Sequence, residues 1–306
     1  MIKGLLSGIL WGLDTTLLSI VLASASFNTS TIIFFAPFIS TFLHDFFSAI
    51  WMSIFTIYKK DYVDTIKLIK TRSGKFIILA SLFAGPIGMT CYLLAIKYLG
   101  PSLTAIISGF YPAFGALLSF LILKEKLHKY NILGLIISIS GVIMLGYFPE
   151  NNTSNFIIGF ICALGCVLGW GSEAVILSYG MKDDKITSNQ ALLLRQLTSS
   201  LTYCFIIIPL ISGINVTINV FKNPIIVFIA IIGLIGTLSY TCYYKAINII
   251  GPTKAMSLNI TYSAWAMIFS FIILQHDLTI KSITLCLVII VGSILASINF
   301  NHQKDS

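Results

Sequence analysis

The chain has 306 residues, of which 57% are hydrophobic and only 10% are charged. A soluble domain carries about 25% charged residues, so this chain cannot cover itself with a polar surface, and the composition indicates an integral membrane protein. Its net charge of +8 does not indicate nucleic-acid binding, because basic loops on the cytoplasmic face of a membrane explain that charge equally well.

Apolar runs long enough to cross a bilayer as helices, which takes about 20 residues, recur along the whole chain. We expect an all-α integral membrane protein with ten spans, at about 4–24, 31–57, 75–96, 101–123, 131–148, 156–179, 190–211, 223–247, 252–274 and 281–300. The connections between them are short, and only the basic stretch 58–74 is both long and charged.

Lysine and arginine gather on one side of these spans. If the N-terminus is inside the cell, the outer loops hold only Lys97, Lys222 and Lys281, and Arg195 lies within a span. Because cytoplasmic loops carry an excess of Lys and Arg, we expect both termini to be cytoplasmic in a multi-pass protein of the plasma membrane.

The two halves of the chain repeat. A shift of 151 positions places Tyr92, Pro101 and Tyr111 on Tyr243, Pro252 and Tyr262 without a gap. The predicted units are 1–149 and 150–306, with five spans each. An odd number of spans puts the halves in opposite orientations, and inverted repeats with a midplane site between them are typical of secondary transporters.

The run from Phe156 to Tyr179 carries a single charge, Glu173, in its interior. Trp170 is spaced i, i+3 from it, so both share a helix face, and an indole beside a buried carboxylate can receive an organic cation. The alternative is an acid that is protonated, or that pairs with an arginine, for packing. A similar motif near the start of the chain, Trp11-Gly12-Leu13-Asp14, aligns with Trp170-Gly171-Ser172-Glu173 and favours the interpretation as a binding site.

Small residues precede both tryptophans. Gly4, Gly8 and Gly12 form GxxxGxxxG, and Gly165 and Gly169 form GxxxG. Such residues let helices approach closely, so we expect the site where these two repeat-related helices meet. We also expect Gly85-Pro86 to break or kink the third span, and Gly100-Pro101 and Gly251-Pro252 to start the fourth and ninth.

Other polar residues lie inside predicted spans. His44 and Asp45 are adjacent, so they are not expected to point the same way; with Asp14 and Glu173 they are candidates for proton coupling. His44 is equally consistent with packing. Arg195 is interpreted as a snorkelling residue or as an ion-pair partner of Asp45 or Glu173.

Aromatic residues form stripes at related positions of the two halves. Asn259, Tyr262 and Trp265 recur every three residues, and their repeat mates are Ser108, Tyr111 and Phe114. Such a stripe is more often packing than a site, but it flanks the place where a transporter pocket is expected. Tyr240, with Tyr243 and Tyr244, is a further candidate.

These features resemble a known family. The repeat architecture and Leu-Lys-Glu-Lys-Leu at 123–127 are similar to the EamA branch of the drug/metabolite transporter superfamily, and closer still to the choline permeases of bacterial lic-type operons. The resemblance to the permeases is carried by His44-Asp45-Phe46, Ala84 to Met89, Trp170 to Glu173, Leu194 to Ser199, Pro252 to Ala255, Leu258-Asn259 and Tyr262 to Trp265.

The resemblance implies uptake of choline, with protons, through an aromatic cage that carries an acid. On this chain the cage falls on Trp11, Trp170, Glu173, Tyr262 and Trp265. Asp14 departs from the family pattern, in which a small or apolar residue is expected, and a second carboxylate beside Trp11 could admit another amine.

We therefore expect a secondary transporter that imports choline or a related quaternary ammonium by alternating access. It acts within the lipid bilayer, takes protons as a second partner, and needs no cofactor or metal. One alternative is an exporter of amino acids, amines or drugs, because a shared fold fixes neither substrate nor direction. An enzyme is disfavoured because HExxH and GxSxG motifs are absent. A purely structural scaffold would not explain the acids within the membrane.

Overall fold

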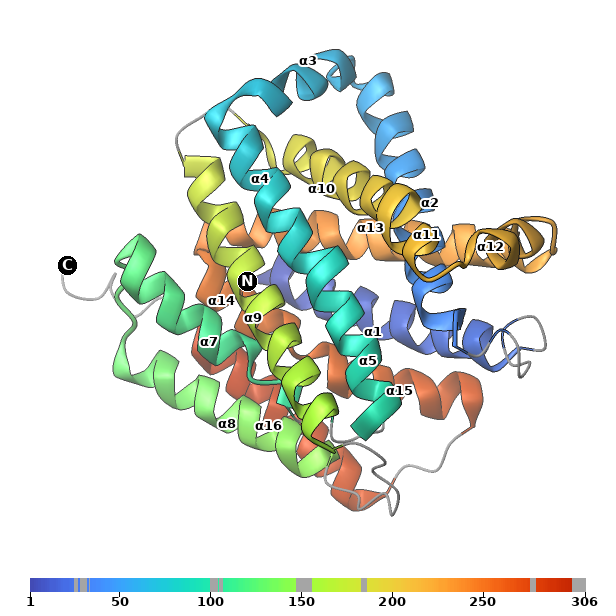
Figure 1. The fold of residues 1–306 in the computed structure, drawn as a ribbon. Coiled ribbons are helices and arrows are strands. Elements are labelled where there is room, and N and C mark those ends of the chain that lie inside the picture. The colour runs from blue at the N-terminus through green and yellow to red at the C-terminus, as the bar shows by residue number, and fades with distance from the viewer. Residues whose placement is uncertain are drawn as a thin grey trace.

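The computed structural model describes residues 1–24, 27, 32, 34–99, 104, 107–146, 156–182, 186–275 and 279–298. All regular structure in these residues is helical (Figure 1). Seven helices of the described part are long and apolar enough to cross a membrane, and three shorter ones, Tyr111–Leu123, Lys129–Met144 and Ile283–Ser297, are also apolar. The all-α membrane class is thus confirmed, while the ten-span inverted arrangement stays a prediction.

The helical elements follow the chain in this order: α1 (Ile2–Ala23), α2 (Ala36–Tyr58), α3 (Tyr62–Lys67), η1 (Leu68–Lys70), α4 (Arg72–Leu82), η2 (Phe83–Met89), α5 (Thr90–Leu99), α7 (Tyr111–Leu118), η3 (Ser119–Leu123), α8 (Lys129–Gly146), α9 (Phe156–Lys182), α10 (Ser188–Thr202), η4 (Tyr203–Ile207), α11 (Ile208–Leu210), α12 (Ile214–Phe221), α13 (Ile225–Ile250), α14 (Pro252–Asn259), α15 (Tyr262–Leu274) and α16 (Ile280–Ser297). The basic stretch after α2 contains the short helix α3, which spans the top of the molecule in Figure 1.

The third span continues through its proline. Pro86 lies inside η2, a seven-residue π-helix that joins α4 to α5 without interruption. Proline removes a backbone donor and crowds the preceding turn, and the wider π-helical turn absorbs this misfit. Of the expected break or kink, the break is absent, because the chain stays helical from Arg72 to Leu99.

The ninth span is divided in two. Gly251, with φ of 83°, precedes Pro252 at the start of α14, as the sequence predicts. α14 ends at Asn259 and α15 begins at Tyr262, so the helix is interrupted between two candidate site residues. The corresponding start at Gly100-Pro101 lies outside the described residues.

Glycines on α1 and α9 allow close contacts with neighbouring helices, but these glycines do not bring α1 and α9 against each other. A Cβ on Gly12 of α1 would lie 2.7 Å from the Cβ of Trp265 on α15, and one on Gly169 of α9 would lie 2.6 Å from the carbonyl oxygen of Phe83. α1 packs on α13, α14 and α15, and α9 packs on α4, α5 and α7. The two glycine motifs therefore do not face each other, because each contacts a different neighbour, and the expectation that the site lies where α1 and α9 meet stays a prediction. α8 and α16 pack side by side at the lower left of Figure 1.

Candidate functional site

Residues from both halves of the sequence form a pocket that is lined mainly by aromatic side chains. Residues from α1, α7, α9, α13, α14 and α15 line it: Trp11, Tyr111, Trp170, Glu173, Ser239, Tyr240, Tyr243, Asn259 and Tyr262. We call it the aromatic pocket. Its free volume is about 40 Å³ in this conformation, which holds a few water molecules at most.

The rings are arranged as two groups. Trp11 and Tyr240 have ring centroids 5.1 Å apart, and Trp170 lies 5.8 Å from Tyr111 and 5.1 Å from Tyr92. These spacings are those of packed aromatic pairs. Because the rings come from four or more helices, a change in helix packing changes the spacing between the two groups.

Glu173 supplies the acid of the aromatic pocket. Its side chain is buried, and its Oε1 accepts a hydrogen bond of 3.0 Å from the hydroxyl of Tyr244. The nearest cation is Arg195, whose Nε lies 3.9 Å from the same oxygen. A buried charge needs close compensation, and this long contact leaves that of Glu173 incomplete.

Asn259 is held in place at the interruption between α14 and α15. Its Oδ1 accepts a hydrogen bond of 3.2 Å from the hydroxyl of Tyr111, and its Nδ2 donates one of 3.1 Å to Oγ of Ser7. The side chain therefore ties α14 to α7 and to α1 at the wall of the pocket.

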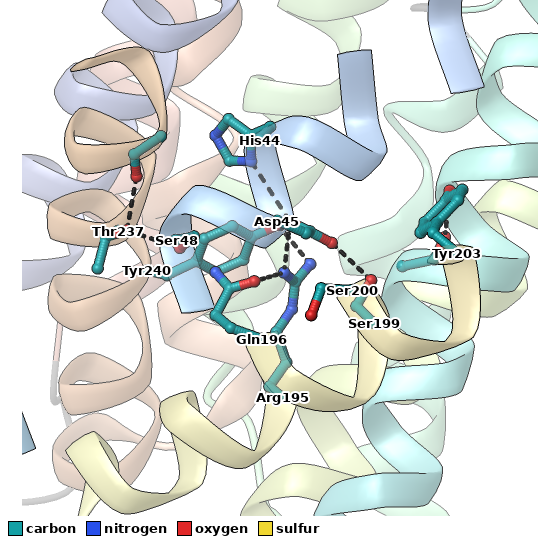
Figure 2. A network of polar contacts seen from close by, with 12 residues as sticks. His44, Asp45, Ser48, Arg195, Gln196, Ser199, Ser200, Tyr203, Thr237 and Tyr240 are labelled. Carbon is teal, nitrogen blue, oxygen red and sulfur yellow. Dashed lines mark hydrogen bonds and ion pairs between the residues drawn. The ribbon is translucent and has the colours of Figure 1, made fainter. Parts of the chain in front are cut away.

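A charge network adjoins the aromatic pocket on α2, α10 and α13 (Figure 2). Arg195 donates from Nη1 to Oδ1 of Asp45 at 3.0 Å and from Nη2 to the hydroxyl of Tyr240 at 2.9 Å. Oδ2 of Asp45 accepts a hydrogen bond of 2.5 Å from Ser199. Nη1 of Arg195 also donates to Gln196. Of the two partners considered for Arg195, Asp45 is thus the closer.

His44 joins this network to a third acid. Its Nε2 lies 3.0 Å from Oδ1 of Asp14 and its Nδ1 lies 3.3 Å from Oδ1 of Asp45. The expectation that His44 and Asp45 point apart is wrong. Adjacent helical positions differ by about 100° in direction, but both side chains turn into the same polar space between α1 and α10.

A larger cavity borders the aromatic pocket on the side of the C-terminal end of α1. Its volume is about 330 Å³, and we call it the Asp14 cavity. Its polar lining consists of Asp14, Thr15, Ser19, Ser40, Thr41, His44, Asp45 and Arg195, and the rest is Leu18, Leu22, Met89, Leu93 and aromatic residues. Trp11, Trp170, Tyr240 and Tyr262 line both spaces.

The structure brings together most of the candidate site residues. The substrate-binding candidates that line the aromatic pocket are Trp11, Tyr111, Trp170, Glu173, Tyr240, Asn259 and Tyr262. Trp265 lines neither space; it packs against Gly12, and its buried Nε1 has no hydrogen-bond partner among the residues that the structure describes. In this conformation Trp265 thus lies apart from the other residues of the expected cage.

Sequence reasoning did not select Tyr92 and Ser239 for the site. Tyr92 packs on Trp170 and lines the Asp14 cavity, and Ser239 lines the aromatic pocket while donating 2.8 Å to the carbonyl of Ser7. Tyr92 carried a signal, since it is the repeat mate of Tyr243, another pocket residue. Ser239 carried none beyond its proximity to Tyr240.

Comparisons with known proteins place the chain in a family. The sequence model of the EamA-like transporter family matches residues 1–147 and 157–298. Protein LicB of Haemophilus influenzae is 36% identical over 254 residues, which cover 82% of each chain. A solved crystal structure of a protein matches with a TM-score of 0.70 over 97% of this chain and 96% of that chain; at 14% identity it supports the fold alone. The chain is thus a multi-pass membrane protein that belongs to the EamA-like transporter family.

Proposed function

We propose that this protein is a secondary transporter that imports choline or a related quaternary ammonium by alternating access, together with protons. The observation that carries the proposal is the aromatic pocket, in which Glu173 is the one acid among rings from both halves of the chain. Family membership supports transport, and the resemblance to choline permeases favours the substrate.

The chemistry of the pocket suits this substrate. The nitrogen of choline has no N–H group to donate, so a site must recognise it through π faces and an opposing charge. Trp11, Trp170 and Tyr240 offer the faces, and Glu173 offers a charge that Arg195 compensates only at 3.9 Å. In this conformation the pocket is contracted, so we expect it to widen when the cation enters.

We further propose that the halves are inverted five-helix repeats, 1–149 and 150–306, with both termini cytoplasmic in the plasma membrane. Two features support the repeat. The bounds of α8 and α16 differ by 151 residues at each end. Lys124 and Gln275, also 151 apart, both end their helices with φ of 55°.

An exporter of amino acids, amines or drugs from the same superfamily is the second candidate. An amino-acid substrate needs a cation for its carboxylate, and both Nη atoms of Arg195 are already engaged by Asp45, Gln196 and Tyr240. Asp14, by contrast, favours an amine. An amine exporter is therefore the stronger form of this alternative.

The first test is calorimetric titration of the purified full chain with choline, betaine, arginine and a lipophilic drug cation. We expect saturable choline binding whose aromatic-pocket component is lost in Glu173→Gln, because the amide keeps the Tyr244 hydrogen bond but removes the charge. Glu125→Gln is the matched control, since Glu125 bonds Thr253 outside the pocket.

No choline binding, combined with binding of an amine that has N–H groups, would replace the proposal with the exporter. Proton coupling is tested by the pH dependence of choline uptake into proteoliposomes. Asp14, His44, Asp45 and Glu173 are the candidate carriers. Uptake that no longer responds to pH in Glu173→Gln would assign the proton to that residue, and unchanged pH dependence would exclude it.

A further inference from the structure

Space for an organic cation lies in the Asp14 cavity of this conformation. The aromatic pocket has about 40 Å³, whereas the Asp14 cavity has about 330 Å³. Small-ligand sites occupy roughly 300–1,000 Å³, so only the second space admits a molecule of that size. The two spaces adjoin, since Trp11, Trp170, Tyr240 and Tyr262 line both of them.

The carboxylate of Asp14 has fewer hydrogen-bond and ion-pair partners than that of Asp45 in the charge network. Asp14 is 1% exposed, and its Oδ1 contacts His44. Its Oδ2 takes no hydrogen bond from any residue that the structure describes. Asp45, by comparison, is bonded by Arg195 and Ser199 as well as contacting His44.

The charges around Asp14 are few. His44 and Asp45 face it from α2, and farther off lie Arg195 of α10 and Tyr240 of α13, which bond to each other. Arg195 is paired with Asp45, so among the residues that the structure describes a protonated His44 is the cation that can balance Asp14. When His44 is neutral, the buried carboxylate of Asp14 faces a cavity whose lining cation, Arg195, is paired with Asp45, and such a charge is costly until a cation arrives.

Aromatic faces accompany this charge. Trp11 lies one turn before Asp14 on α1, so both are on one face of the helix. Tyr240 and Tyr92 add rings from α13 and α5. An acid without a close cation beside several rings is the combination that recognises quaternary ammonium groups, and Asp14 with these rings provides it a second time.

We propose that the Asp14 cavity is a second binding site for small quaternary ammonium ions, with Asp14 as the counter-charge. The cation occupies it before passing the shared rings into the aromatic pocket. This inference rests on the proposed function. Because a proton on His44 balances the same carboxylate, proton and cation compete at this site.

The test is equilibrium binding of radiolabelled choline to the purified full chain in lipid nanodiscs. We expect two sites per wild-type protein, one in Asp14→Asn and one in Glu173→Gln. Asp64→Asn is the matched control, because Asp64 is exposed on α3 and paired with Lys67, and it should keep two sites. A wild type with a single site, or two sites in Asp14→Asn, would overturn the proposal.

Leu18→Trp provides a second variant that leaves every charge in place. Leu18 lines the Asp14 cavity but not the aromatic pocket, and the larger ring would fill the space. It should remove one site even if Asp14→Asn fails to fold, and retention of both sites would contradict the proposal.

His44→Gln cannot carry a proton, so choline binding to the second site should lose its dependence on pH. Dependence that persists in this variant would count against competition at Asp14. The two hypotheses fail differently. Absence of choline binding in the wild type removes the proposed function. A single site that is lost in Glu173→Gln and kept in Asp14→Asn removes only this inference.

Discussion

The charge network and the aromatic pocket are neighbours that handle charge in opposite ways. In the network, Asp45 accepts hydrogen bonds from Arg195 and Ser199, and Arg195 also bonds Gln196 and Tyr240. In the pocket, Glu173 has one hydrogen bond, from Tyr244, and a distant guanidinium. A buried ion pair with several further hydrogen bonds, such as Arg195 with Asp45, holds helices together, whereas an acid with few partners beside aromatic rings leaves its charge for a ligand.

Asp45→Ala in the charge network should have the largest effect. This change leaves Arg195 as an uncompensated buried cation, and removing one partner of a buried pair costs about 3–5 kcal/mol. We expect a large drop in thermal stability, measured as loss of the monodisperse size-exclusion peak on heating. The double variant Asp45→Leu with Arg195→Met should recover much of it. Unchanged stability of Asp45→Ala would mean that the network is not a structural element.

Gly12→Ala tests how tightly α1 must approach α15 to place Trp11. Its Cβ would lie 2.8 Å from the backbone nitrogen of Ala266, which cannot move aside. Such overpacking costs about 1–3 kcal/mol, and we expect lower thermal stability together with weaker choline binding. Gly213→Ala is the control, since there the nearest atom lies 3.3 Å away on the Ile211 side chain. Equal effects of both substitutions would show that the close approach of α1 to α15 at Gly12 is not required.

Ser48→Ala removes a single bond between α2 and α13 at the edge of the network. Ser48 Oγ lies 2.6 Å from Oγ1 of Thr237, which also donates to the carbonyl of Gly233. Thr237 keeps a partner, so the loss should be about 1 kcal/mol, measured by chemical or thermal unfolding. A double-variant cycle that combines Ser48→Ala with Thr237→Val should give a coupling free energy of the same size. A coupling free energy of zero would show that this hydrogen bond does not contribute to stability.

Trp170→Phe tests the role of the aromatic pocket in binding a cation. Phenylalanine keeps a ring between Tyr92 and Tyr111 but presents a weaker π face, which changes a cation contact by about 0.5–1 kcal/mol. We expect choline affinity to fall about two- to fivefold in calorimetric titration. Trp51→Phe is the control, because Trp51 donates to Ala230 away from both cavities and should leave affinity unchanged.

Much of this was readable from the sequence because hydrophobic length and spacing are local properties. Apolar run lengths predicted the all-α membrane class, and helical spacing predicted that Trp170 and Glu173 share a face. The proline at 86 shows a limit: local rules predict a break, but a π-helical turn keeps the helix intact.

By itself, the sequence determined the class of protein, the family and most of the side chains that line the aromatic pocket, because periodicity and motifs are encoded locally. Only the tertiary structure decided which partners those side chains take. It seats Trp265 against Gly12, places His44 between Asp14 and Asp45, and brings Arg195 closer to Asp45 than to Glu173. These choices depend on how helices far apart in the chain pack, and spacing along one helix carries no information about its neighbours.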